Sequence, residues 1–195
     1  MPKNRKLHGV DKTRTKRDVN NCCVGMSRIS MTALADAIVM IRAMNIAQKE
    51  ILAGELSRVQ PNMLASVVVL PRMGVSLSKM EVPIEMLLIC FQAMKQAGLN
   101  WPLITEAEQE KQLGRYIAAV RVGEDMGRLG PGQNTRAMKK YLITFPEKPL
   151  LAFVTTELSK WLAGVAPEET DSHIMLSIVN LVNCIAFVPM PRAGK

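Results

Sequence analysis

Apolar residues recur every three or four positions in one segment of this chain after another, and proline and glycine separate these segments. Such spacing gives an α-helix one apolar face, whereas a half-buried strand needs strict alternation. The first run predicts one helix that Ser30 or Thr32 caps and that extends towards Pro61, which ends it or begins another. Its apolar positions are Leu34, Ile38, Ile41, Met44, Ala47, Ile51 and Leu52.

Two further helices have recognisable start and stop signals. A helix over residues 83–97 has proline just inside its start and Gly98 just past its end, which is the usual asymmetry. The stretch Thr105 to Glu108 matches a capping box, and the helix that it opens extends to about Val122.

The C-terminal third predicts two more long helices. Residues 150–163 form the first, which Gly164 ends, and residues 173–187 form the second, which Asp171 or Ser172 can cap. A short helix is expected near Thr135.

Between these helices the signals are weaker. Residues 63–70 are apolar and include three consecutive valines, so they predict either a short buried helix or a strand near Val67. Pro71 and Gly74 break the chain, residues 123–134 form a glycine-containing loop, and Pro146 and Pro149 bracket a turn. The fold class is therefore all-α, with about six or seven helices.

The chain divides into an arm, a body and a tail. Residues 1–25 lack apolar periodicity and predict a flexible basic arm, residues 26–188 predict one helical domain, and residues 189–195 predict a loose tail. Aromatic residues make up only 4% of the chain, whereas Met occurs 14 times. Met therefore fills the helical core or lines a groove for a partner.

Cysteine and histidine usage argues against a metal site, a cofactor and a secreted protein. Cys22, Cys23, Cys90 and Cys184 contain no C-x-x-C spacing, and the chain has only two histidines, His8 and His173. No secretory signal precedes residue 30, so we expect reduced thiols in a cytoplasmic protein. Residues 173–188 are too short and too polar for a membrane span.

No catalytic constellation stands out, so we expect a protein that is not an enzyme. Asp171, Ser172 and His173 are adjacent at a helix start, where they are better explained as capping groups than as a triad. Residues 127–133 lack the Lys-Ser/Thr ending of a phosphate-binding loop. Glu106, Glu108 and Glu110 suit the first turns of a helix.

Positive charge is concentrated in two segments. The net charge is +8, to which the arm contributes +5 and residues 111–140 another +5, so the remainder carries −2. The candidate nucleic-acid contacts are Lys3, Arg5, Lys6, Lys12, Arg14, Lys16 and Arg17 in the arm, with Arg115, Arg121, Arg128, Arg136, Lys139 and Lys140 in the second segment.

Clustered cations favour a polyanionic partner, because they release condensed counterions when they meet phosphates. We therefore expect a non-enzymatic protein that binds DNA or RNA, such as a transcriptional regulator or packaging factor of a bacterium, mobile element or virus. This hypothesis requires the two basic segments to lie close together in space.

Three alternatives remain open, and one of them is an enzyme of unfamiliar type, which needs a pocket with convergent polar groups. The charge runs can be ordinary solvated faces, with the protein acting as a structural or interaction module that self-assembles through Met-rich helices. A helix-turn-helix over residues 83–122 would place Lys111 and Arg115 on its second helix, but its connection is longer than usual.

Overall fold

Helices account for all regular structure in the described residues. The computed structural model describes residues 27–128 and 143–190, and for residues 122–128 it describes the backbone alone. No strand occurs within these ranges. The α-helices there are α1 (Met31–Ala43), α2 (Ile46–Val59), α3 (Pro61–Val68), α4 (Glu81–Gln96), α5 (Glu106–Arg128), α7 (Lys148–Gly164) and α8 (Asp171–Phe187), with 3-10 turns η1 (Leu70–Met73) and η2 (Leu77–Lys79). The all-α prediction is confirmed.

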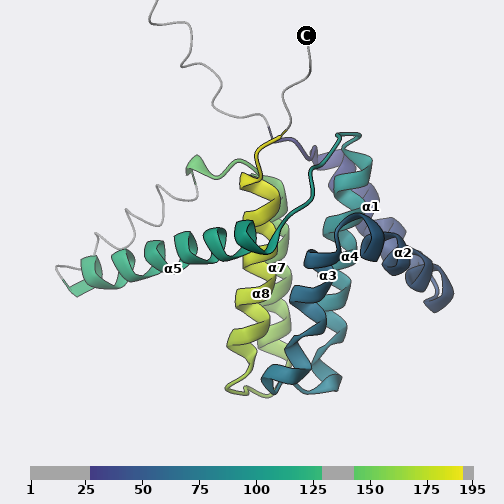
Figure 1. Ribbon diagram of the computed structural model, residues 1–195. Coiled ribbons are helices and arrows are strands. Elements are labelled where there is room, and N and C mark those ends of the chain that lie inside the picture. The colour runs from purple at the N-terminus through teal and green to yellow at the C-terminus, as the bar shows by residue number, and fades with distance from the viewer. Residues whose placement is uncertain (1–26, 129–142, 191–195) are drawn as a thin grey trace, which may run out of the picture.

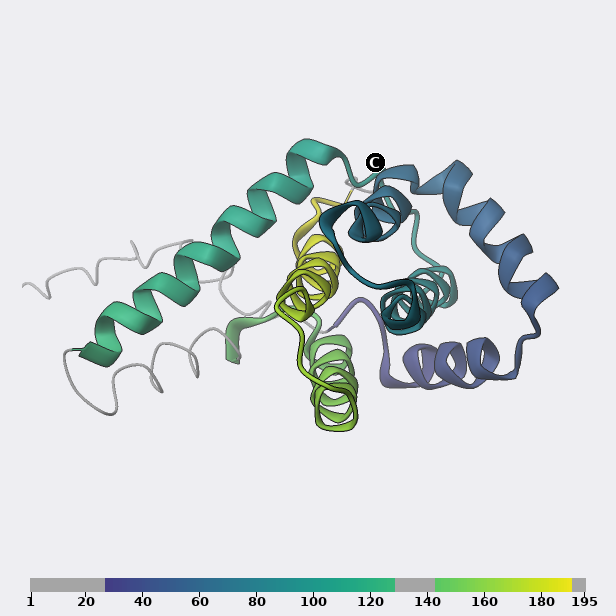
Figure 2. The same cartoon turned by 90° about the horizontal axis from the view of Figure 1, so that it is seen from below.

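Helices α4 and α8 form the centre of the molecule. They pack against each other, α1 covers α4, and α7 contacts both α4 and α8. Residues 86–91 of α4 and residues 181–186 of α8 are buried without a break, so these stretches of the two helices are enclosed on nearly all sides. Helix α5 crosses α8 and extends outward on one side of the bundle, while α1 and α2 lie on the other side (Figures 1 and 2).

The helix predicted to run from about residue 30 towards Pro61 is in fact two helices. Ser30 caps α1 as expected, because its side chain accepts the N–H of Ala33 at 3.0 Å. The chain then breaks at Met44, and Asn45 starts α2 through a capping box with Gln48. The periodicity missed this break, because apolar residues continue across it.

The strand considered near Val67 is wrong, and the helical alternative is correct. Pro61 begins α3 at a position where its missing N–H costs nothing. Met63 and Val67, one turn apart, are buried against the core, and Gly74 with φ of 92° ends η1.

Two other boundaries differ from expectation. Helix α5 continues through Gly123 to Arg128, so the loop predicted from residue 123 begins later; residues 129–134 and the helix expected near Thr135 lie outside the described residues. Helix α7 begins at Lys148, which places Pro149 inside its first turn and leaves a turn at residues 146–147.

The capping predictions are half right. Thr105 accepts the N–H of Glu108 at 3.2 Å, but the Glu108 carboxylate accepts from Gln112 and Lys111 rather than completing the box. Neither Asp171 nor Ser172 caps α8, because Thr170 occupies the cap position without a side-chain bond.

Helices over residues 83–97 and 150–163 are confirmed as α4 and α7, and Gly98 follows α4 with φ of 65°.

Candidate nucleic-acid interface

A buried carboxylate joins two distant parts of the chain. Glu147, which is 0% exposed, accepts hydrogen bonds from the Ser27 hydroxyl, from the backbone N–H groups of Arg28 and Ile29, and from Arg28 Nε. The two bonds from Arg28 are both 3.0 Å long. Because a buried carboxylate is costly unless its lone pairs are filled, this set of donors fixes residues 27–29 onto the turn before α7.

Arg28 extends the same junction to the end of α8. Its Nη1 donates to the Val188 carbonyl at 3.0 Å, and its Nη2 donates to the carbonyls of Ile185 and Ala186. These carbonyls belong to the last turn of a helix, where partners are missing and the dipole favours a cation. The guanidinium also stacks 4.9 Å from the centre of the Trp101 ring.

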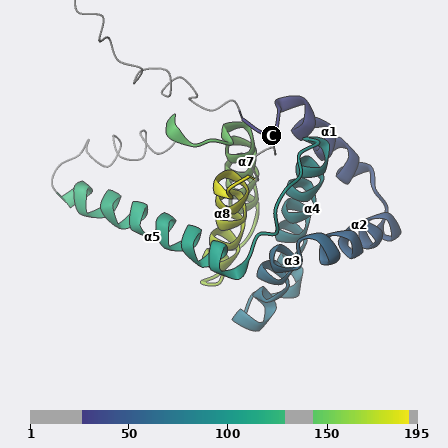
Figure 3. The same cartoon turned by 45° about the horizontal axis from the view of Figure 1, so that its top comes forward.

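Three basic segments are therefore attached at one place. Residues 1–26 lead into Ser27, residues 129–142 lead into the segment that ends at Glu147, and residues 191–195 follow shortly after Val188. Figures 1 and 3 show these three attachment points at the same end of the helix bundle, while residues 129–142 also join the outer end of α5 at Arg128. The segments carry twelve Lys and Arg against two Asp, a net charge of +10.

The described residues carry the opposite balance, with thirteen Lys and Arg against fifteen Asp and Glu. Several of their cations are already neutralised. Arg42 bridges Glu85 and Glu157, which raises its pKa through these hydrogen bonds, and the same cluster lowers the pKa of Glu157, chiefly through Lys160. Lys95 pairs with Glu55, and Lys111 with Glu108. The body therefore has a slightly negative net charge, and several of its cations are paired with carboxylates.

Helix α5 does not display its arginines as one row. The Arg115 guanidinium lies 4.4 Å from the Phe187 ring centre and donates to Gln112, so it leans onto the end of α8. Arg121 is exposed and lies six residues later, which places it about 120° away around the helix. Arg128 follows Arg121 by a heptad, on the same side of the helix axis.

The other predicted contacts fall outside the described residues. These are Lys3, Arg5, Lys6, Lys12, Arg14, Lys16 and Arg17 of the arm, and Arg136, Lys139 and Lys140 of the second segment. The structure brings together the points where the arm and the C-terminal end of the second segment join the body, whereas the other end of the second segment follows Arg128 at the outer end of α5.

The residues considered for catalysis make other contacts. Asp171 accepts from Lys79 Nζ at 2.6 Å and from the Glu168 N–H at 2.9 Å, and Ser172 donates to the Glu169 carbonyl. None of these bonds involves His173. Burial raises the pKa of the Cys90 and Cys184 thiols to about 12, with Glu108 adding to the effect at Cys184. Among the side chains of residues 27–121 and 143–190, no group of three or more metal-binding residues assembles.

The described helices also include none that is long and apolar enough to cross a bilayer. Comparison with protein families, with curated proteins and with solved structures finds no match to this chain.

Sequence reasoning missed Arg28 and Glu147, the two residues that organise the junction. Glu147 lies between two prolines whose spacing predicts only a turn. A carboxylate in such a turn is ordinary, and nothing within its neighbourhood of the sequence points to a partner 119 positions away.

Proposed function

We propose that this protein binds nucleic acid without catalysing a reaction, through basic segments that leave the body around the Arg28–Glu147 junction. The observation that carries the proposal is that junction, because it attaches segments with a net charge of +10 at one end of a body with a net charge of −2. Charge gathered in this way meets neighbouring phosphates together, whereas scattered charge would not.

Chain length supports joint action. Arg17 lies eleven positions before Arg28, Lys140 seven before Glu147, and Arg192 four after Val188. Eleven residues span at most about 40 Å when fully extended, so covalent connection alone keeps these cations near the junction. Backbone phosphate contacts of this kind carry no sequence information, so they suit a packaging factor or the general-affinity part of a regulator.

A salt series tests this proposal. Fluorescence polarisation with duplex DNA and with single-stranded RNA of equal length is measured from about 50 to about 200 mM salt. If about six cations contact duplex phosphates, the logarithm of affinity falls with the logarithm of salt with a slope of about −5. Absence of binding to both probes at the lowest salt would refute the proposal.

Matched triple variants locate the contact. Arg14, Lys16 and Arg17 changed to Gln should make the slope on duplex DNA shallower by about 2 to 3. The control changes Lys49, Arg58 and Arg72 of the body to Gln, which removes the same charge away from the junction. Equal effects of the two triples would show that net charge alone matters and would overturn the role of the junction.

Self-association is a second candidate, favoured by exposed apolar side chains on α1 and α2. Val39, Ile46 and Ile51 are 69%, 78% and 75% exposed. Ile51 also lines a depression of about 300 Å³, together with Met40, Met44 and Leu52 on its apolar side and Gln48, Glu55, Gln92 and Lys95 on its polar side. Its two methionines are consistent with the alternative of a methionine-lined groove.

Light scattering distinguishes this candidate. If the protein forms an oligomer through this surface, Ile51→Asp should dissociate it. Leu103→Asp is the control and should leave the oligomer intact, because Leu103 is an exposed apolar residue on the linker before α5. A wild-type monomer at all concentrations contradicts it.

A further inference from the structure

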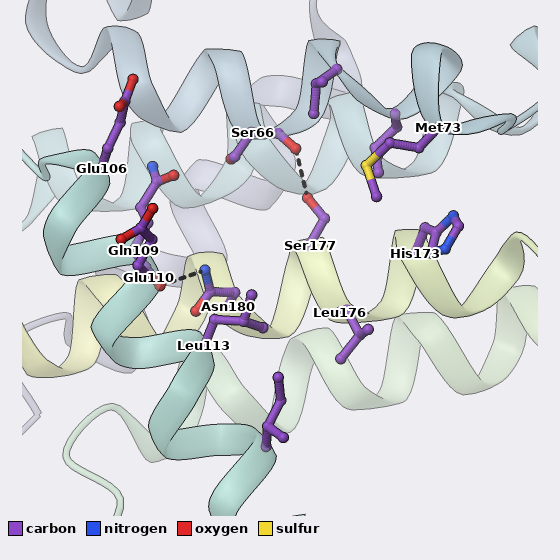
Figure 4. A pocket seen from close by; sticks show the side chains of 13 residues that line it. Ser66, Met73, Glu106, Gln109, Glu110, Leu113, His173, Leu176, Ser177 and Asn180 are labelled. Carbon is purple, nitrogen blue, oxygen red and sulfur yellow. Dashed lines mark hydrogen bonds between the residues drawn. The ribbon is translucent and has the colours of Figure 1, made fainter.

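A cavity of about 380 Å³ lies between α3 with η1, the start of α5, and α8. Most of its wall is apolar and comes from all three sides: Val69, Leu70, Met73, Leu113, Ile117 and Leu176. The Ser177 hydroxyl donates to the Ser66 carbonyl at 3.1 Å and ties α8 to α3 within this wall (Figure 4). Its size and its mostly apolar lining match those of small-molecule sites in proteins.

Two polar atoms in the lining have no partner. His173 Nδ1 and Asn180 Oδ1 are the buried side-chain polar atoms without a hydrogen bond among the side chains of residues 27–121 and 143–190. The Asn180 amide is oriented by its Nδ2, which donates to the Gln109 carbonyl at 3.1 Å and leaves Oδ1 as a free acceptor. Buried polar groups are normally satisfied, so these two atoms indicate missing donors or acceptors.

The charge at the cavity is negative. Glu106 and Glu110 line it at the α5 end, and no Lys or Arg lines it. Neither carboxylate forms an ion pair with any cation of the described residues; Lys111, the nearest lysine in sequence, binds Glu108 instead. This end therefore favours a cation or a neutral donor over an anion.

Figure 4 shows the polar groups at two separate places. Gln109, Glu110 and Asn180 gather at the α5 end, whereas His173 lies at the other end beside Met73. An occupant that satisfies both ends needs a donor group at the first and a group able to pair with an imidazole nitrogen at the second. A phenol suits His173 in either tautomer, because its hydroxyl both donates and accepts.

We propose that this cavity binds a small arylalkylamine, with its ammonium group between Glu110 and Asn180 Oδ1, its ring against Leu176 and Met73, and a ring hydroxyl at His173 Nδ1. The apolar wall holds the ring, and the two unpartnered atoms set the orientation. This site is independent of the junction at Glu147, and a ligand here contacts one wall of α5.

Calorimetric titration with a probe series tests the chemistry. Tyramine carries all three groups, 4-ethylphenol lacks the ammonium, and 3-(4-hydroxyphenyl)propionate replaces it with a carboxylate. Tyramine should bind saturably, 4-ethylphenol more weakly, and the carboxylate least. Absence of saturable tyramine binding at millimolar concentration, or equal binding of the carboxylate, overturns the proposal.

Variants locate the site. Leu176→Trp fills the cavity from a partly exposed position and should abolish tyramine binding, whereas Met40→Trp fills the separate depression near α2 and should not. Glu110→Gln should weaken tyramine by up to about fivefold and leave 4-ethylphenol unchanged. Circular dichroism checks that each variant is folded. Tyramine binding that survives Leu176→Trp in a folded protein would place the ligand elsewhere and refute the assignment.

Discussion

Glu147 accepts hydrogen bonds from both the backbone N–H and the Nε of Arg28, each 3.0 Å long, across 119 positions of sequence. The same arginine donates to Val188, so a single side chain connects the start of the body with its last helix. Near this contact the arm, the C-terminal end of the second basic segment and the tail all join one end of the bundle. The proposed nucleic-acid interface depends on this ion pair more than on any single exposed cation.

Replacing the buried carboxylate should destabilise the fold strongly. Glu147→Gln removes the charge that Arg28 faces, and breaking a buried pair in this way costs about 3 kcal/mol. Urea denaturation measures this loss. Glu85→Gln, which removes one partner of the exposed Arg42, is the control and should cost less than about 1 kcal/mol. Equal losses in the two variants would contradict a structural role for the junction.

The Lys79–Asp171 pair should make stability depend on pH. Both side chains are 8% exposed and 2.6 Å apart. Hydrogen bonds from Lys79 and from the Glu168 N–H lower the pKa of Asp171 below 3.8. Burial lowers the pKa of Lys79, but its bonds to Asp171 and Glu168 outweigh burial and raise this pKa above 10.5.

A carboxyl group whose pKa is lowered in the folded state stabilises the fold at pH values above its unfolded-state pKa, and this contribution is lost as the pH falls through the folded-state pKa. A lysine whose pKa is raised in the folded state stabilises the fold at pH values below its unfolded-state pKa, and this contribution is lost as the pH rises through the folded-state pKa. The pair therefore contributes fully between about pH 4 and pH 10. Denaturation at pH 7 and pH 3 should show that Asp171→Asn destabilises the protein less at the lower pH. The exposed Asp36→Asn should show no such difference, and a constant Asp171→Asn effect would exclude this linkage.

Native Cys90 and Cys184 should resist thiol reagents. At pH 8, a thiol with a pKa of about 12 is ionised to only about one part in ten thousand, and both residues are buried. In a Cys22→Ser, Cys23→Ser background, a colorimetric disulfide reagent should titrate no thiol in the native protein and two in denaturant. Rapid reaction of either thiol without denaturant would show that this part of the core opens.

Two glycines should respond oppositely to alanine. Gly74 has φ of 92°, and a Cβ there would meet Thr170 at an ordinary 3.5 Å, so Gly74→Ala should cost about 1 kcal/mol through backbone strain alone. Gly54 lies within α2 with open space around it, so Gly54→Ala should stabilise by about 0.5 to 1 kcal/mol. Thermal unfolding compares the two, and the same sign for both would be inconsistent with these backbone conformations.

Local chemistry made most helices predictable. Gly98 after α4, Thr105 before α5 and Gly164 at the end of α7 act within a few residues, so their effects can be seen in the sequence. The break at Asn45 was hidden because its cap lies inside a continuous apolar run. Asp171 was misassigned for a different reason, since its carboxylate is drawn to a lysine on a distant 3-10 turn.

The sequence alone determined that the chain is helical and where its positive charge lies, because periodicity, caps and charge are properties of neighbouring residues. The tertiary structure alone decided that Arg28, Glu147 and Val188 meet, and that an apolar cavity forms where α3, α5 and α8 converge. Such contacts depend on how the helices pack. No local sequence pattern encodes that an arginine will pair with a particular buried carboxylate more than a hundred positions away.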